Sequence, residues 1–304
     1  MAFLSKKKEK WLLSRAKIYK GVFVGKNIGK NAIADAFYRK AIEKEFIKYI
    51  EAFYNDLQGV YGVLQVNNAI KTPKVSVNRV LDVIKKYKGA KLRIFLKNAD
   101  KIIRKWLKKA SQSTNKNIQN VLFEMAGKEI TLNYNRDYDN ILKLIIDRNV
   151  QLITNVSSQT LTNIENIVFD GMTTGGGWGE IEKTLKEQKV VADNRIKLIA
   201  RDQTAKANAT LNELQQRDAG IKFFMWRTMG DERVSTGKGG HKQLDGKIYA
   251  WDEKENYPVI DSYGNTGLPS QRPNCRCVAL PVWILKGYKP VKQFDGSYKI
   301  EKDE

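Results

Sequence analysis

The sequence predicts an α+β protein, with a mainly α-helical N-terminal body and a small C-terminal α+β module. The first observation is the distribution of proline: no proline lies between Pro73 and Pro258, and five of the six fall in the last fifth of the chain. Long helices need proline-free chain, whereas clustered prolines accompany irregular or β-rich chain. The second is that 42% of the 304 residues are hydrophobic, which suffices for one large buried core or two smaller ones.

Apolar residues in the body recur every three or four positions, as one face of a helix requires. The clearest series is Ile42, Phe46, Ile50, Phe53 and Leu57. A similar series over residues 142–156 predicts another long helix. Further helices are predicted over residues 76–87, 91–110, 180–187 and 193–218. The Gly-rich segment 171–179 is expected to be a hinge loop, and Gly220 to cap the last helix at its C-terminus.

The pattern changes after Gly220. Residues 221–229 (IKFFMWRTM) are rich in β-branched and aromatic side chains and predict a strand. The pair Asp245-Gly246 predicts a tight turn, and residues 277–280 predict another short strand. We therefore divide the chain into four regions: a basic helical region at 1–135, a helical part of the following domain at 136–220, a small β-containing module at 221–285 and a C-terminal tail at 286–304.

Positive charge is concentrated in the first part of the chain. The net charge is +21, and residues 1–120 hold 28 Lys and Arg against 8 Asp and Glu, a net charge of +20. Such a field attracts polyanions, of which nucleic acid is the most common. A solvated basic surface without a specific partner is the alternative, and an anionic membrane surface is a third possibility.

Eleven basic residues lie within 25 positions, interleaved with apolar ones. They are Lys85, Lys86, Lys88, Lys91, Arg93, Lys97, Lys101, Arg104, Lys105, Lys108 and Lys109. A helix of this kind can pack one face and offer the other to phosphates. Because no base-reading motif accompanies them, we expect any DNA binding to be independent of sequence and strongly dependent on salt.

Cys275 and Cys277 are the only cysteines, too few for a disulfide scaffold and too close in sequence for an easy disulfide with each other. A reducing compartment during synthesis fits this usage. No run of about eighteen apolar residues is present, so we expect no transmembrane helix. The basic N-terminus is not followed by an apolar segment and a cleavage site, which argues against a secretory signal.

One group of polar residues near the C-terminus has the composition of a metal site. His241, the only histidine, could combine with Cys275, Cys277 and Asp231 as four zinc ligands, although Cys-x-Cys is shorter than the usual structural spacing. The alternative is a cross-braced module without metal, in which His241 makes buried hydrogen bonds and the cysteines pack as small apolar groups. A nucleophilic site is disfavoured because no second acid–base pair accompanies these residues.

Short motifs follow one another in a fixed order. Trp226-Arg227-Thr228 precedes Asp231-Glu232-Arg233-Val234; then come His241 with Leu244-Asp245-Gly246, and Asn274-Cys275-Arg276-Cys277. Ala200-Arg201-Asp202-Gln203-Thr204 lies ahead of them on a predicted helix. This set resembles the phage head morphogenesis domain of the Mu F and SPP1 minor head protein family, over residues from about 140 to 283. The Gly-rich segment 235–240 and the Arg-Asp-Gln-Thr sequence depart from the family pattern.

The resemblance implies a structural, non-enzymatic minor capsid protein of a tailed bacteriophage, located in the virion head and in the host cytoplasm during assembly. It implies the portal protein and other head proteins as partners, and the basic helices add packaged DNA. Trp226, Arg233, Asp245, Gly246 and Arg276 would be structural motif residues. No cofactor other than zinc is indicated, and no membrane partner is expected. The alternatives are a metal-dependent nuclease or toxin-like effector packaged in the virion, and a cytoplasmic DNA-binding protein.

Overall fold

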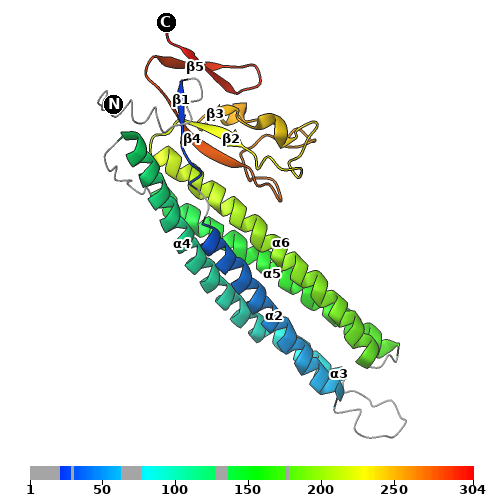
Figure 1. Cartoon of the computed structure of the whole chain (residues 1–304). Coiled ribbons are helices and arrows are strands. Elements are labelled where there is room, and N and C mark those ends of the chain that lie inside the picture. The colour runs from blue at the N-terminus through cyan, green and yellow to red at the C-terminus, as the bar shows by residue number, and fades with distance from the viewer. Residues whose placement is uncertain (1–20, 29–30, 63–76, 127–135, 175–177) are drawn as a thin grey trace, which may run out of the picture. The chain divides into compact units, whose positions relative to one another are not determined.

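The computed structural model describes residues 21–28, 31–62, 77–126, 136–174 and 178–304 (Figure 1). Long helices dominate the first part of the chain and a curled sheet dominates the last. The α+β prediction is therefore confirmed.

The described α-helices are α2 (Ala32–Gly62), α3 (Val77–Lys86), α4 (Leu92–Ala126), α5 (Arg136–Thr173) and α6 (Trp178–Asp218). A π-helical segment, Tyr87–Lys91, joins α3 directly to α4. The predicted break between residues 187 and 193 is wrong, since α6 continues through it. This segment contains no Pro or Gly, and its apolar Val190 and Val191 are exposed. The apolar pattern therefore lapses there while the backbone remains helical.

Two compact units make up the chain, and both are assembled from separate segments. We call Met1–Ala32, Lys108–Ile141 and Asp202–Glu304 the sheet unit, and Ile33–Leu107 and Leu142–Arg201 the helical unit. The four regions predicted from sequence are continuous segments, so their boundaries differ from those of the two units.

The helical unit is built around the predicted apolar face of α2. Ile42, Phe46, Ile50, Phe53 and Leu57 are all buried, as the spacing predicts. Aromatic side chains extend this core along the helices. Their ring pairs include Tyr38 with Trp106, Tyr49 with Phe95 and Phe53 with Tyr87, with centroids 4.4, 4.9 and 4.6 Å apart.

Polar groups inside the helical unit have partners across helices. The Tyr38 hydroxyl donates to Asn149 Oδ1 at 2.8 Å, and the Trp106 indole N–H donates to Asp35 Oδ1 at 3.2 Å. Desolvation raises the pKa of Tyr38 well above its ordinary value. These contacts fix the register of the helices, because a buried polar atom left without its partner is costly.

A six-stranded antiparallel sheet forms the other half of the fold. Its strands are β1 (Val22–Val24), β2 (Phe223–Arg227), β3 (Ile248–Ala250), β4 (Val278–Ile284), β5 (Tyr288–Lys292) and β6 (Tyr298–Lys302), in the spatial order β1-β4-β2-β3-β6-β5. Both strands predicted after residue 220 are present as β2 and β4. The segment expected to be only a tail instead forms the β5–β6 hairpin, and β1 adds an edge strand from near the N-terminus.

Aromatic side chains fill the core of the sheet unit. Trp226, Tyr249 and Trp251 lie together in one buried cluster. Trp283 lies outside this cluster. It packs instead against a separate cluster that contains Val121 of α4, and its ring is 5.9 Å from that of Phe23. Trp283 lies on the same face of β4 as Ala279, which belongs to the cluster of Trp226, but four residues further along the strand, where Phe23 of β1 is its neighbour in the sheet.

Gly220 caps α6 as predicted. Its φ is +72°, its amide donates to the Arg217 carbonyl at 2.9 Å, and the Ile221 amide donates to the Gln216 carbonyl at 2.9 Å. This is the Schellman pattern, which requires a left-handed residue just after the helix. The cap turns the chain from α6 into β2.

Substitution of Gly220 by alanine should lower the free energy of unfolding of the sheet unit by about 1–2 kcal/mol, the cost of a left-handed L-residue. A Cβ at this position meets no atom within 4 Å, so the loss reports backbone conformation alone. Gly59→Ala is the matched control, since that glycine is also unobstructed but lies inside helix α2. It should stabilise the helical unit by about 0.5–1 kcal/mol. Urea denaturation of both variants checks the pair, and equal effects would contradict the capping role.

Candidate functional site

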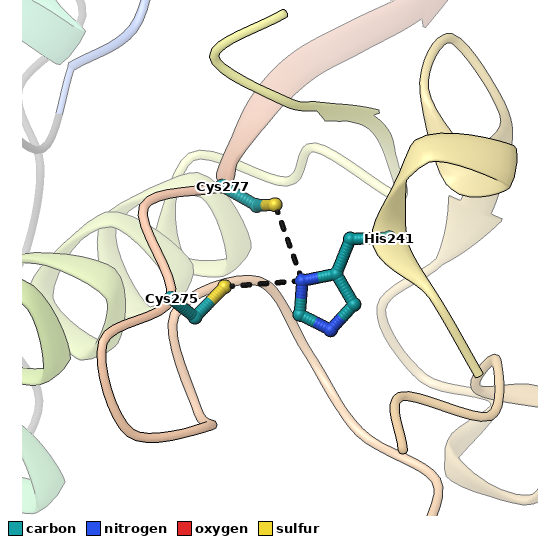
Figure 2. Close-up of side chains that lie close together, drawn as sticks. All are labelled: His241, Cys275 and Cys277. Atoms are coloured by element: carbon teal, nitrogen blue, oxygen red, sulfur yellow. Dashed lines mark hydrogen bonds between the residues drawn. The ribbon is translucent and has the colours of Figure 1, made fainter. Parts of the chain in front are cut away.

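His241, Cys275 and Cys277 come together in the sheet unit, and we call them the His-Cys cluster. His241 begins the 3₁₀ turn His241–Leu244, and both cysteines lie in the loop that leads into β4. All three side chains are buried, and their ligand atoms lie within 4.8 Å of one another. Figure 2 shows both sulfur atoms directed at the same ring nitrogen.

The imidazole of His241 is held from both sides. Its Nε2 lies 3.1 Å from the Ile260 carbonyl oxygen, which can only accept, so Nε2 carries the proton. Its Nδ1 lies 3.4 Å from each of the two sulfur atoms. The ring also meets Trp226 edge to face, with centroids 5.3 Å apart. The contact with the Ile260 carbonyl thus leaves the Nδ1 lone pair facing both thiols.

The thiols and the imidazole perturb one another strongly. Hydrogen bonding from Cys277 and then from His241 lowers the pKa of Cys275. The same interaction with Cys275, together with burial, raises the pKa of Cys277. Hydrogen bonding to Cys275 raises the pKa of His241.

The loop that carries the cysteines is tied down on several sides. Ser270 and Asn274 both have positive φ, 67° and 60°. The Ser270 amide lies 3.3 Å from Cys275 Sγ, and its hydroxyl donates to the Cys277 carbonyl at 2.8 Å. The Asn274 amide donates to Asp202 Oδ1 at 3.1 Å. The Arg-Asp-Gln-Thr motif on α6 and the Asn-Cys-Arg-Cys motif thus meet in space.

Asp231 stands apart from the His-Cys cluster, contrary to its predicted place among the ligands. Both of its oxygens accept from Arg276, at 2.7 and 2.6 Å, and Arg233 contacts it at 3.2 Å. A bidentate guanidinium holds a carboxylate more firmly than a single hydrogen bond does. Arg276 thus pairs with Asp231, while Asp245 accepts a hydrogen bond from Arg227.

The pair Asp231–Arg276 should make stability sensitive to acid. Hydrogen bonds from Arg276 lower the pKa of Asp231 from 3.8 to about 2. A lowered folded pKa adds stability above pH 3.8, and that stability is lost as the pH falls through 2. Asp231→Asn should therefore be modestly less stable than the parent at neutral pH, and the two should converge near pH 2. Urea midpoints measured across this range check it, and a difference that does not change with pH would contradict it.

The remaining motif residues brace β2. The Asp245 carboxylate accepts from the Thr228 amide at 2.7 Å and from Arg227 at 3.2 Å. Gly246, at φ +79°, donates its amide to the Trp226 carbonyl at 2.8 Å. Trp226 is fully buried, whereas Arg233 is largely exposed. Hydrogen bonds therefore hold the Asp245-Gly246 turn against the end of β2.

Two polar residues of α6 that sequence reasoning missed hold β4 in place. Asn212 and Gln216 donate to the same Ala279 carbonyl at 2.8 and 3.0 Å, and Gln216 also accepts from the Trp251 indole at 3.2 Å. Both side chains are buried. Their spacing of four residues on a helix face that otherwise packs is the signal that could have revealed them.

The basic residues occupy the outer face of the helical stretch 85–109. All eleven are exposed, whereas Phe95, Ala99, Ile103 and Trp106 on the other side of α4 are buried. Ion pairs join Lys86 to Asp56, Lys88 to Glu165 and Arg104 to Asp100. We call the eleven residues the basic face.

Comparison with known proteins finds a family similar to the region around the His-Cys cluster. The family model for "Phage Mu protein F like protein" matches residues 162–280, which include α6, β2, β3 and the whole His-Cys cluster. Over this segment, the chain is similar to the phage Mu protein F-like family. The resemblance expected from the motifs is thus confirmed, and the family favours a structural role over an enzymatic one.

Two relatives extend this result. Over 276 residues the chain is 27% identical to an uncharacterized protein of Haemophilus influenzae (strain ATCC 51907 / DSM 11121 / KW20 / Rd), an alignment covering 88% of this chain and 56% of that protein. Over 156 residues it is 23% identical to the minor head protein GP7 of Bacillus phage SPP1, covering 47% of this chain and 48% of the phage protein. The chain thus spans about half the length of each. No solved structure matches it significantly.

No helix in the described part of the chain combines the length and apolar composition needed to cross a bilayer. Within the same residues, His241, Cys275 and Cys277 are the only group of three or more His, Cys, Asp or Glu side chains arranged to share a metal ion. A nuclease that uses Mg²⁺ would need clustered carboxylates. The His-Cys cluster contains none.

Proposed function

We propose that this Mu F-like chain is a structural minor capsid protein of a tailed phage, built into the virion head. The observation that carries the proposal is the family match over residues 162–280, because it covers α6 and most of the braced module together. The similarity to a phage minor head protein supports it. The architecture agrees with such a role, since the motif residues serve here to brace β2, β4 and the cysteine loop.

The portal protein and other head proteins are the proposed partners, with assembly in the host cytoplasm. The support is the family resemblance, because proteins of this kind join the head at few copies beside the portal. Quantitative mass spectrometry of purified virions tests the proposal. We expect the chain at far lower abundance than the major capsid protein, and cross-linking should join it to the portal. Absence from purified virions would overturn the head role.

Contact with packaged DNA is the second part of the proposal, and the basic face supports it. Arg93, Lys97, Lys101, Arg104 and Lys108 recur every three or four residues, so they form a stripe along α4. With a rise of 1.5 Å per residue, this stripe is about 22 Å long. A stripe of that length can lie along a series of phosphates. Side chains that reach only phosphates carry no sequence information.

A salt titration distinguishes DNA from an acidic protein surface as the partner of the basic face. The full chain should bind unrelated duplexes of equal length with equal affinity, and the logarithm of that affinity should fall linearly with the logarithm of salt concentration. Failure to bind DNA even at low salt would remove DNA from the proposal and leave an acidic protein surface.

A further inference from the structure

We propose that the His-Cys cluster is a zinc site, in which Nδ1 of His241 and the sulfur atoms of Cys275 and Cys277 bind one Zn²⁺ ion. The site lies within the sheet unit, so it does not depend on the head role or on DNA contact. Its function would be to lock the cysteine loop to the 3₁₀ turn at His241, segments separated by more than thirty residues.

The distances match those of a tetrahedral zinc centre. Zinc bonds of about 2.3 Å to sulfur and about 2.0–2.1 Å to nitrogen place bonded sulfur and nitrogen atoms about 3.5 Å apart at the tetrahedral angle. Both sulfur atoms lie 3.4 Å from His241 Nδ1 (Figure 2). The three ligand atoms therefore stand where one ion can reach them without rearrangement of the backbone.

Without a cation, the two thiols have only weak hydrogen bonds to offer one another and the imidazole. The proton of His241 is on Nε2, where it meets the Ile260 carbonyl. The single lone pair on Nδ1 can accept from one thiol only, although both thiols lie at the same distance. Zinc would bind the Nδ1 lone pair together with both thiolates, and the two thiol protons would pass to solvent.

Groups around the cluster favour thiolates and orient the ligands. The Ser270 amide lies 3.3 Å from Cys275 Sγ. The Trp226 indole N–H is buried without a hydrogen-bond partner among the described residues, and the Trp226 ring meets that of His241 edge to face. The Ile260 carbonyl fixes the ring of His241. Such contacts are the usual second layer around protein zinc, where N–H donors face sulfur and a carbonyl holds the imidazole.

The donor set also selects the ion. Two thiolates and an imidazole suit zinc, whereas Mg²⁺ and Ca²⁺ require oxygen ligands and iron–sulfur clusters ordinarily need more cysteines. The proposed site has three protein ligands, and water would complete the tetrahedron. Asp231 is not the fourth, because Arg276 holds both of its oxygens.

Elemental analysis of the full chain, purified under reducing conditions without chelator, tests the site. We expect one equivalent of zinc per chain. Cys275→Ser, Cys277→Ser and His241→Asn should each lower the zinc content tenfold or more. Asp231→Asn is the matched control and should retain one equivalent, which also separates the three-residue site from the four-residue set expected from sequence. Loss of zinc from this control in a folded protein would overturn the site as proposed.

Cobalt substitution uses the parent protein, so it tests the site even if the variants fail to fold. After removal of zinc by a chelator, added Co²⁺ should give the intense visible bands of tetrahedral coordination and a sulfur-to-cobalt charge-transfer band. The two thiols, the only ones in the chain, should be protected from a thiol reagent until the metal is removed. No bound metal in the purified chain and no cobalt spectrum would overturn the proposal, as would a Cys275–Cys277 disulfide detected by mass spectrometry.

Discussion

Replacement of Trp226 by alanine is expected to lower the free energy of unfolding of the sheet unit by about 3–5 kcal/mol. Trp226 is fully buried near the C-terminal end of β2, where it packs in the cluster that contains Tyr249 and Trp251 and meets the ring of His241. Its removal leaves a cavity among aromatic side chains that cannot collapse together. Because domains are stable by only about 5–15 kcal/mol, this one change removes a large share of the total.

Urea denaturation measures the loss of stability. Hydrogen exchange followed by mass spectrometry shows which part of the chain is affected. Peptides from β2 and β4 should lose protection in Trp226→Ala, whereas peptides from α2 in the helical unit should keep it. Trp226→Phe retains most of the ring volume and is the matched control, with a smaller expected loss. A loss from the alanine variant below about 1 kcal/mol would show that the core of the module lies elsewhere.

Neutralisation of four residues of the basic face is expected to weaken non-specific DNA binding by about 10²- to 10³-fold at 0.1 M salt. The variant carries Arg93→Gln, Lys97→Gln, Lys101→Gln and Lys108→Gln, all exposed on α4 and outside the ion pairs described above. Each neutralised phosphate releases condensed counterions, so the slope of log affinity against log salt should become shallower by about 0.9 for each phosphate that is no longer neutralised. Fluorescence anisotropy with unrelated duplexes measures both quantities.

The control must remove the same total charge from another surface. Lys238, Lys289, Lys299 and Lys302 are exposed in the sheet unit, and their replacement by glutamine also removes four positive charges. This control should bind DNA nearly as the parent does. Equal weakening in both variants would mean that net charge, not the basic face, drives binding. An unchanged salt slope in the α4 variant would remove this face as the DNA-binding surface.

Regular patterns in the sequence made several elements predictable. The spacing from Ile42 to Leu57 located the buried face of α2, and Gly220 located the end of α6. The β-branched and aromatic run at residues 221–229 located β2. These features are local, because helix periodicity, a left-handed cap and strand composition depend on neighbouring residues only.

Other predictions failed where distant segments decide the outcome. The predicted break between residues 187 and 193 is absent, because a long helix tolerates the exposed Val190 and Val191 when no Pro or Gly interrupts it. The predicted C-terminal tail at 286–304 contains the β5–β6 hairpin, whose short strands carry many charged side chains. Trp283 lies on the same face of β4 as Ala279, yet it packs beside Phe23 and the cluster that contains Val121, because it is further along the strand than the residues that meet Trp226.

By itself, the sequence determined the fold class, the family motifs in their order, the excess of basic residues and the residue types available for a metal site. The tertiary structure decided which of those residues meet. It places Nδ1 of His241 beside the sulfur atoms of both cysteines, and it pairs Asp231 with Arg276 instead. It also joined Asp202 of α6 to the cysteine loop and placed the eleven basic side chains on one exposed face. The physical reason is that these contacts link residues far apart in the chain, and only folding fixes which partner each buried or charged group obtains.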